Sequence, residues 1–125
     1  AMTAHVTYAA IDPDNPASTS EVIISEIIRG ALGFRGLLIS DDISMGALEG
    51  DFAERANRVL GAGVDLVLHC NGEMAEMEEV ARSVEPLAPA VAADLDLLLG
   101  EAETRRRQMP LNLAQLEDEA WDGKA

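Results

Sequence analysis

The chain has 125 residues, of which 48% are hydrophobic, so it is long enough for one domain with a core. Its formal net charge of −14 argues against the basic surface that nucleic acids and anionic membranes require, and we expect neither as a partner. A single cysteine, Cys70, excludes an internal disulfide. We expect no signal peptide and no membrane-spanning segment, and therefore a cytoplasmic protein.

A strand over residues 2–6 begins the first predicted unit, and a loop with two prolines separates it from a helix. Ser18, with Glu21 three residues later, predicts a capping box at the start of that helix. Gly33 is a suitable end for it. Apolar side chains recur along one helical face: Val22, Ile23, Ile24, Ile27, Ile28 and Leu32.

Two more strand–helix units follow, with strands predicted over residues 37–40 and 64–69. Their helices are expected over residues 51–62 and 73–84, and a longer helix over residues 90–108 ends in three arginines, which favour the negative end of the helix dipole. The inward face of the second unit's helix is expected to hold Phe52, Ala56, Val59 and Leu60. Alternating strands and helices predict an α/β fold with parallel strands.

Three such units cannot close a barrel, which needs about eight, and they leave unpaired strand edges. We therefore expect the chain to be part of a larger fold. Exposed edges recruit other chains, so we expect either a homo-oligomer or assembly with the missing N-terminal part of the barrel.

The most informative segment covers residues 36–45, where an apolar strand stops at Ser40 and two carboxylates follow at once. In α/β folds the chemistry lies at the carboxyl ends of parallel strands, so Asp41 and Asp42 are candidate catalytic groups. Strand ends and helix caps also favour aspartate for structural reasons alone. The spacing does not choose between these two interpretations.

Several segments resemble glycoside hydrolase family 3, and within it the bacterial β-N-acetylhexosaminidases of cell-wall recycling. They are MTAHV at residues 2–6, Ile27-Ile28-Arg29, GLLISDDISM at residues 36–45 and AGVDLVLHCNG at residues 62–72. One position departs, since Ala31 stands where the family pattern favours a charged or amide residue. The resemblance implies a partial (β/α)8 TIM barrel, with residues 1–109 as its last three βα units and residues 110–125 as a C-terminal tail.

The resemblance also implies a retaining glycosidase that removes terminal β-linked N-acetylglucosamine from cell-wall fragments, without cofactor or metal. It assigns Asp41 as the nucleophile that forms the covalent glycosyl-enzyme. Asp42 is expected to support the site by capping or hydrogen bonding, because adjacent strand residues point to opposite faces. In this family the acid/base Asp–His pair and the sugar-gripping residues lie on earlier barrel segments, so we expect the chain alone to be inactive.

Two residues are weaker candidates for substrate binding. His5 lies near the end of the first predicted strand, and Met45 falls inside the family motif; a structural histidine and a core methionine are the alternatives. His69 and Cys70 are two possible metal ligands, too few for a zinc site, so barrel packing is the favoured interpretation.

Two other functions stay open at this point. One is a small receiver-like or flavodoxin-like domain whose acidic pair binds magnesium, which would need a third acid such as Asp12 or Asp14 nearby. The other is a non-catalytic, self-associating half-barrel.

Overall fold

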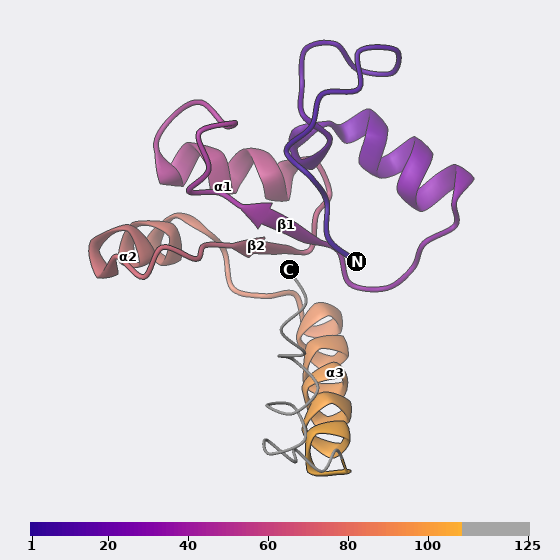
Figure 1. The fold of residues 1–125 in the computed structure, drawn as a ribbon, viewed down its shortest axis with the longest axis vertical. Helices are drawn as coiled ribbons and strands as arrows, with labels where there is room; N and C mark the ends of the chain where they lie inside the picture. The colour runs from indigo at the N-terminus through magenta and orange to yellow at the C-terminus, as the bar shows by residue number, and fades with distance from the viewer. Residues whose placement is uncertain (109–125) are drawn as a thin grey trace, which may run out of the picture. The chain divides into compact units, whose positions relative to one another are not determined.

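The computed structural model describes residues 1–108, and the expected tail over residues 110–125 lies outside the described part. The chain divides into two compact units, residues 1–91 and 92–125. The first contains most of the regular elements (Figure 1): η1 (Ala17–Thr19), η2 (Ile23–Ala31), β1 (Ile39–Asp42), α1 (Phe52–Gly61), β2 (Leu66–Leu68) and α2 (Met74–Ser83). The last helix, α3 (Pro89–Gln108), begins at the end of the first unit.

β1 and β2 pair in parallel, which confirms the α/β class with parallel strands. Ile39 pairs with Leu66, and Met2 forms an isolated parallel bridge to Ile39 on the other side. The predicted strand over residues 2–6 is therefore wrong beyond this single bridge, because the chain bends at His5. β1 also begins two residues later than predicted, and β2 is shorter than predicted.

The hydrophobic core lies on one face of the two strands, under α1 and η2 (Figure 1). Leu38 and Ser40 are fully buried on that face, whereas Ile39 and Asp41 are only half-buried on the opposite one. This alternation is the two-residue period of a strand. The core cluster consists of Ile24, Leu38, Ile43, Leu48, Ala56, Val59, Ala62 and Val64.

The later helices agree with the sequence prediction to within a residue or so at each end. Asp51 caps α1, since its side chain accepts from the Glu54 backbone N–H while the Glu54 carboxylate accepts from the Asp51 N–H. Ala56 and Val59 face the core as expected. α2 packs against α1 but has no buried residue, and Met74 is 63% exposed. Among the residues described, no helix is both long and apolar enough to cross a membrane.

The first predicted helix, which contains η2, differs from its prediction in two ways. Ser20, not Ser18, caps it, because the Ser20 hydroxyl accepts the Ile23 N–H while Ser18 bonds His5. η2 is wound as a π-helix, whose i→i+5 bonds change which residues share a face relative to an α-helix. Leu32, the C-cap residue of η2, is 72% exposed although it belongs to the predicted apolar stripe. Gly33, with φ of 65°, ends the helix as predicted.

An ion pair joins η2 to the two-stranded sheet. Arg29 Nη2 donates to Asp65 Oδ2 at 2.6 Å, and the same oxygen accepts the Leu38 N–H at 2.8 Å. Arg29 Nη1 also donates to the Gly36 carbonyl at 2.8 Å. Both charged side chains are only 23% exposed, so the pair is less screened by solvent than a surface pair. The Asp65 carboxylate therefore ties η2, the strand entry at Leu38 and the start of β2 together.

We expect Asp65→Ala to lower the free energy of unfolding of the 125-residue chain by about 2–3 kcal/mol. The substitution leaves the Leu38 N–H and the Arg29 guanidinium without their shared acceptor. Denaturant unfolding measures the effect. Glu78→Ala is the matched control, because Glu78 pairs with Arg82 on an exposed helix surface and should change stability by about 0.5 kcal/mol at most. Equal effects of the two substitutions would contradict the role given to Asp65.

Candidate functional site

The candidate site lies at the carboxyl end of β1, where the sheet gives way to the loop before α1. The pairing of β1 with β2 is irregular here, because two residues of β1, Ser40 and Asp41, lie between its two paired positions, whereas Val67 alone lies between those of β2. Such a β-bulge changes the direction of side chains and is common next to active sites.

Asp41 lies on the half-buried face of β1, away from the hydrophobic core. Its Oδ1 accepts the backbone N–H of Asp42 at 2.9 Å, and its carbonyl oxygen accepts the Ser40 hydroxyl at 2.7 Å. Within the described residues, its Oδ2 has no hydrogen-bond partner. The carboxylate is therefore anchored through one oxygen while the other is free for chemistry.

Asp42 lies in a different environment, in which both carboxylate oxygens are used. Oδ1 accepts the backbone N–H groups of Ser44 at 3.0 Å and Cys70 at 3.2 Å, and Oδ2 accepts the Ser44 hydroxyl at 2.6 Å. These bonds join the loop after β1 to the chain just after β2. Asp42 does not cap a helix, since Asp51 caps α1.

Burial raises the pKa of Asp42, but the hydrogen bonds from Ser44 and Cys70, together with the nearby His69, more than offset it and lower the pKa below its ordinary value. A lowered pKa keeps the carboxylate charged in the folded state. The resulting stability is present above the unfolded-state pKa and is lost as the pH falls through the folded-state value.

The two candidate binding residues lie near this junction. His5 Nδ1 is 2.6 Å from Ser18 Oγ, and His5 Nε2 is 3.0 Å from the Asp42 carbonyl oxygen. Both ring nitrogens thus have protein partners, as in the structural interpretation of this residue. Met45 has a 44% exposed side chain, and its backbone N–H donates to the same Asp42 carbonyl. His5 and Met45 therefore meet at the Asp42 backbone.

His69 and Cys70 follow β2 but do not form a shared ligand set. His69 Nε2 lies 3.1 Å from Glu76 Oε2, and the imidazole packs edge-on against Phe52 with ring centroids 5.2 Å apart. Cys70 is exposed, and its backbone N–H donates to Asp42. Residues 1–108 contain no group of three or more His, Cys, Asp or Glu side chains suited to a metal ion.

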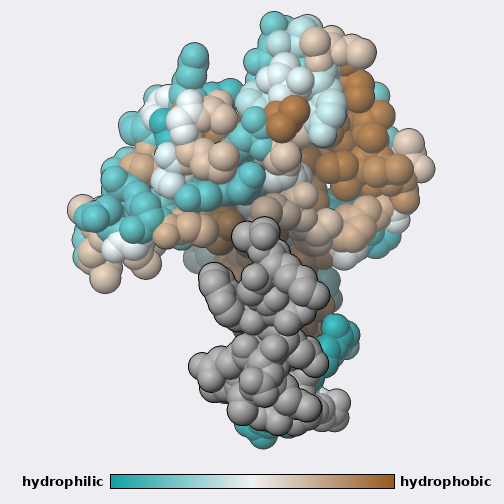
Figure 2. All heavy atoms as spheres, viewed as in Figure 1, coloured by the Kyte–Doolittle hydropathy of each residue, from teal (hydrophilic) through white to brown (hydrophobic). Residues whose placement is uncertain are grey.

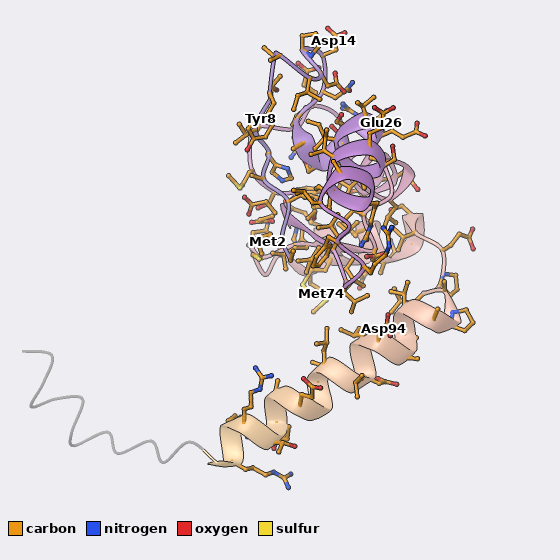
Figure 3. All side chains as sticks on the ribbon, turned by 90° about the vertical axis from the view of Figure 1, so that its right-hand side faces the viewer. Met2, Tyr8, Asp14, Glu26, Met74 and Asp94 are labelled. Carbon is orange, nitrogen blue, oxygen red and sulfur yellow. The ribbon has the colours of Figure 1, made fainter. Side chains whose placement is uncertain are left out.

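The third acid that a receiver-like domain would need is not at this edge of the sheet. Asp12 accepts the backbone N–H of Asp14 and the hydroxyl of Ser20 within its own loop. Figure 3 shows Asp14 at the tip of that loop, which projects away from the strands. The receiver-like interpretation therefore lacks its acidic cluster in the described part of the chain.

Sequence reasoning missed two residues that shape the site. The sequence pattern indicates only a strand end at Ser40, yet its hydroxyl links both strands. Arg55 holds the loop after β1, because it donates to the carbonyl oxygens of Ile43 at 2.8 Å and Gly50 at 2.9 Å. It also lies over the Phe52 ring, 5.5 Å from the centroid. The adjacency of Ser40 to the acid pair was the one available signal; nothing in the pattern identified the targets of Arg55.

Comparisons with known proteins agree on one family. Residues 1–96 match the glycosyl hydrolase family 3 N terminal domain. The beta-hexosaminidase of Aromatoleum aromaticum is 38% identical over 99 residues, covering 78% of this chain and 28% of the relative. That of Chromobacterium violaceum is 37% identical over 103 residues, covering 81% and 29%. The chain thus spans less than a third of the length of these relatives.

Solved structures give the same result. Native NagZ from Neisseria gonorrhoeae superimposes with a TM-score of 0.63 at 34% identity, covering 77% of this chain and 26% of that one. The beta-N-acetylhexosaminidase of Beutenbergia cavernae gives a TM-score of 0.58 at 35% identity, covering 76% and 29%. Both the family match over most of the chain and these likenesses lead to the same conclusion: the chain belongs to glycosyl hydrolase family 3 and corresponds to part of its N-terminal domain.

Proposed function

We propose that this chain supplies the nucleophile segment of a retaining β-N-acetylhexosaminidase. Asp41 attacks the anomeric carbon of a terminal β-linked N-acetylglucosamine, and the aglycone leaves as the covalent glycosyl-enzyme forms. The proposed substrates are cell-wall fragments, processed during peptidoglycan recycling in the cytoplasm. Membership of the family supports this proposal, and so do the beta-hexosaminidase names of its relatives.

The observation that carries the proposal is the contrast between the two carboxylates. Asp41 has one oxygen anchored by a backbone N–H and one without a partner among the described residues, as a nucleophile requires. Asp42 has both oxygens occupied by donors from the loop and from Cys70, as a supporting residue would. His5 and Met45, proposed to border the sugar site, meet at the Asp42 backbone.

Glycoside hydrolysis by this mechanism needs a second group about 5 Å from the nucleophile that acts as acid and then as base. Asp42 is a poor choice for that task because its lowered pKa keeps it charged. The family resemblance places the acid/base pair and the sugar-gripping residues in earlier segments of the barrel. Residues 1–109 are proposed to be the last three βα units of that barrel, so the chain carries one part of a larger site.

The chain alone should therefore not hydrolyse an aryl N-acetyl-β-glucosaminide at a measurable rate. General acid catalysis contributes roughly 10²- to 10⁴-fold, and loss of substrate positioning removes most of the remaining acceleration. Release of the chromogenic phenol from the purified 125-residue chain is the measurement. Turnover that disappears in Asp41→Ala would contradict this expectation.

The complete domain allows the two carboxylates to be distinguished. It can be built as a chimera in which residues 1–96 replace the matching segment of a full-length relative. Asp41→Asn should lower kcat by several orders of magnitude, because an amide cannot form the glycosyl-enzyme. Asp42→Asn should retain much more activity but lower the free energy of unfolding by about 1–3 kcal/mol through weakened hydrogen bonds to Ser44 and Cys70.

Two further measurements sharpen this comparison. A fluorinated substrate that accumulates the glycosyl-enzyme should label Asp41, as read by peptide mass spectrometry, and a label on Asp42 would overturn the assignment. Asp42→Asn should also reduce the loss of stability on acidification, because it removes a carboxylate whose pKa is lowered by folding.

Assembly with another chain is also proposed, because among the described residues a strand edge is unpaired and hydrophobic side chains are exposed. In the described part of the chain β2 pairs only with β1, so its outer edge is unpaired. Figure 2 shows a hydrophobic surface over η2, and the two residues that flank this helix, Val22 and Leu32, are exposed. Burying such a side chain contributes about 1.5–3 kcal/mol, which favours association. The isolated chain is proposed to be a homo-oligomer, and the missing part of the barrel is the alternative partner.

Light scattering on the purified chain tests the assembly proposal. A mass of at least twice 13.3 kDa at tens of micromolar is expected, with dissociation on dilution. Leu32→Glu should shift the equilibrium toward monomer, since it replaces an exposed hydrophobic side chain at the end of η2 by a charged one. Glu21→Gln, an exposed change near the same helix, is the control. A cooperatively folding monomer would refute self-association.

A further inference from the structure

The irregular pairing at the end of β1 has a specific hydrogen-bond pattern. At its start the ladder is regular, since the Leu66 N–H donates to the Leu38 carbonyl at 3.1 Å. A regular parallel ladder would continue with Leu68 N–H donating to the Ser40 carbonyl, and then Asp42 N–H donating to the Leu68 carbonyl. The register shifts instead, because Asp42, in place of Asp41, is the partner of Leu68.

The Ser40 hydroxyl connects the two strands where the register shifts. Leu68 N–H donates to Ser40 Oγ at 3.0 Å, and Ser40 Oγ donates to the Asp41 carbonyl at 2.7 Å. The Ser40 side chain is fully buried, so water cannot substitute for it without repacking. One hydroxyl thus binds β2 beside the bulge and holds the Asp41 backbone.

The next hydrogen bond between the strands is donated by Ile43, one residue later than in a regular ladder. Ile43 N–H, instead of Asp42 N–H, donates to the Leu68 carbonyl at 2.9 Å. The Asp42 N–H is thereby free of the sheet, and it donates to Asp41 Oδ1 at 2.9 Å. In a regular strand that N–H would be used between the strands and could not reach the carboxylate.

We infer that Ser40 is the positioning residue for the nucleophile: its hydroxyl maintains the bulge that frees the Asp42 N–H to orient the Asp41 carboxylate. This inference rests on the proposed function. Ser40 touches no substrate in this role and acts only through Asp41. A bound N–H donor fixes which carboxylate oxygen points toward the anomeric carbon, and misplacement of a reacting group by about 1 Å can cost roughly 100-fold in rate.

The test uses Ser40→Ala in the complete domain. We expect kcat to fall roughly 10- to 100-fold with little change in KM, because the lost alignment affects attack and not sugar binding. Ser40→Thr keeps the hydroxyl and should restore most of kcat. Hydrogen exchange at the Leu68 amide should accelerate in Ser40→Ala and stay slow in Ser40→Thr, which reports on the bulge independently of catalysis.

Two controls separate positioning from stability. Ser20→Ala removes another fully buried hydroxyl, which caps η2, and should lower stability while leaving kcat unchanged. In an Asp41→Gly background, azide can replace the nucleophile by attacking the anomeric carbon as the aryl oxide leaves. Adding Ser40→Ala there should cause no further loss, since no carboxylate remains to be positioned.

The outcomes distinguish this inference from the proposed function. An active domain that loses activity in Asp41→Asn but keeps full kcat in Ser40→Ala would overturn the inference and leave the function intact. An equal loss from Ser40→Ala in the azide-rescued background would also overturn it. An inactive unmutated chimera, or one active without Asp41, would overturn the proposed function and the role of Ser40 with it. If Ser40→Ala does not fold, Ser40→Cys, whose thiol is a weak hydrogen-bonding group, replaces it in each comparison.

Discussion

The hydrogen bond between the Ser40 hydroxyl and the Leu68 N–H determines the geometry at the end of β1. It holds the two strands together where β1 carries one more residue than β2 over the same stretch. The consequences follow along the chain in order. The Asp42 N–H turns toward Asp41, and the ladder resumes one residue late at Ile43. A regular strand would keep all these backbone groups between the strands.

The bulge also explains how two adjacent carboxylates can have separate roles. Asp42 faces the donors at the end of β2 and in its own loop, and those hydrogen bonds outweigh the cost of its burial and lower its pKa. Asp41 receives a single N–H and stays on the less covered face of β1. Like-charged neighbours of this kind are tolerated because one charge is satisfied by backbone dipoles while the other remains partly hydrated.

The parts predicted well from sequence are those determined by neighbouring residues. The bounds of α1 and α2 follow from local apolar spacing, α3 ends at the predicted run of arginines, and Asp51 lies at the expected helix start. The sequence predictions fail where a contact with a residue distant along the chain determines the local structure. Ser18 bonds His5 instead of capping η2, and the bridge at Met2 ends after one pair because the chain bends toward the Asp42 carbonyl. The family motif points to Asp41 as the proposed nucleophile, but the Ser40 hydroxyl beside it bonds across the sheet, which no local pattern reveals.

The contacts that hold the proposed nucleophile all come from within this segment. Its anchor is the Asp42 N–H, the bulge depends on Ser40 and Leu68, and the Asp42 backbone is braced by His5. None of these contacts requires a group from elsewhere in a barrel. Orientation of the nucleophile is therefore a property that a short strand pair can encode by itself, whereas acid–base catalysis needs a second group held on the opposite side of the sugar bond. Different parts of one fold can therefore supply the nucleophile and the acid/base group, because the two groups depend on each other only through the distance between them.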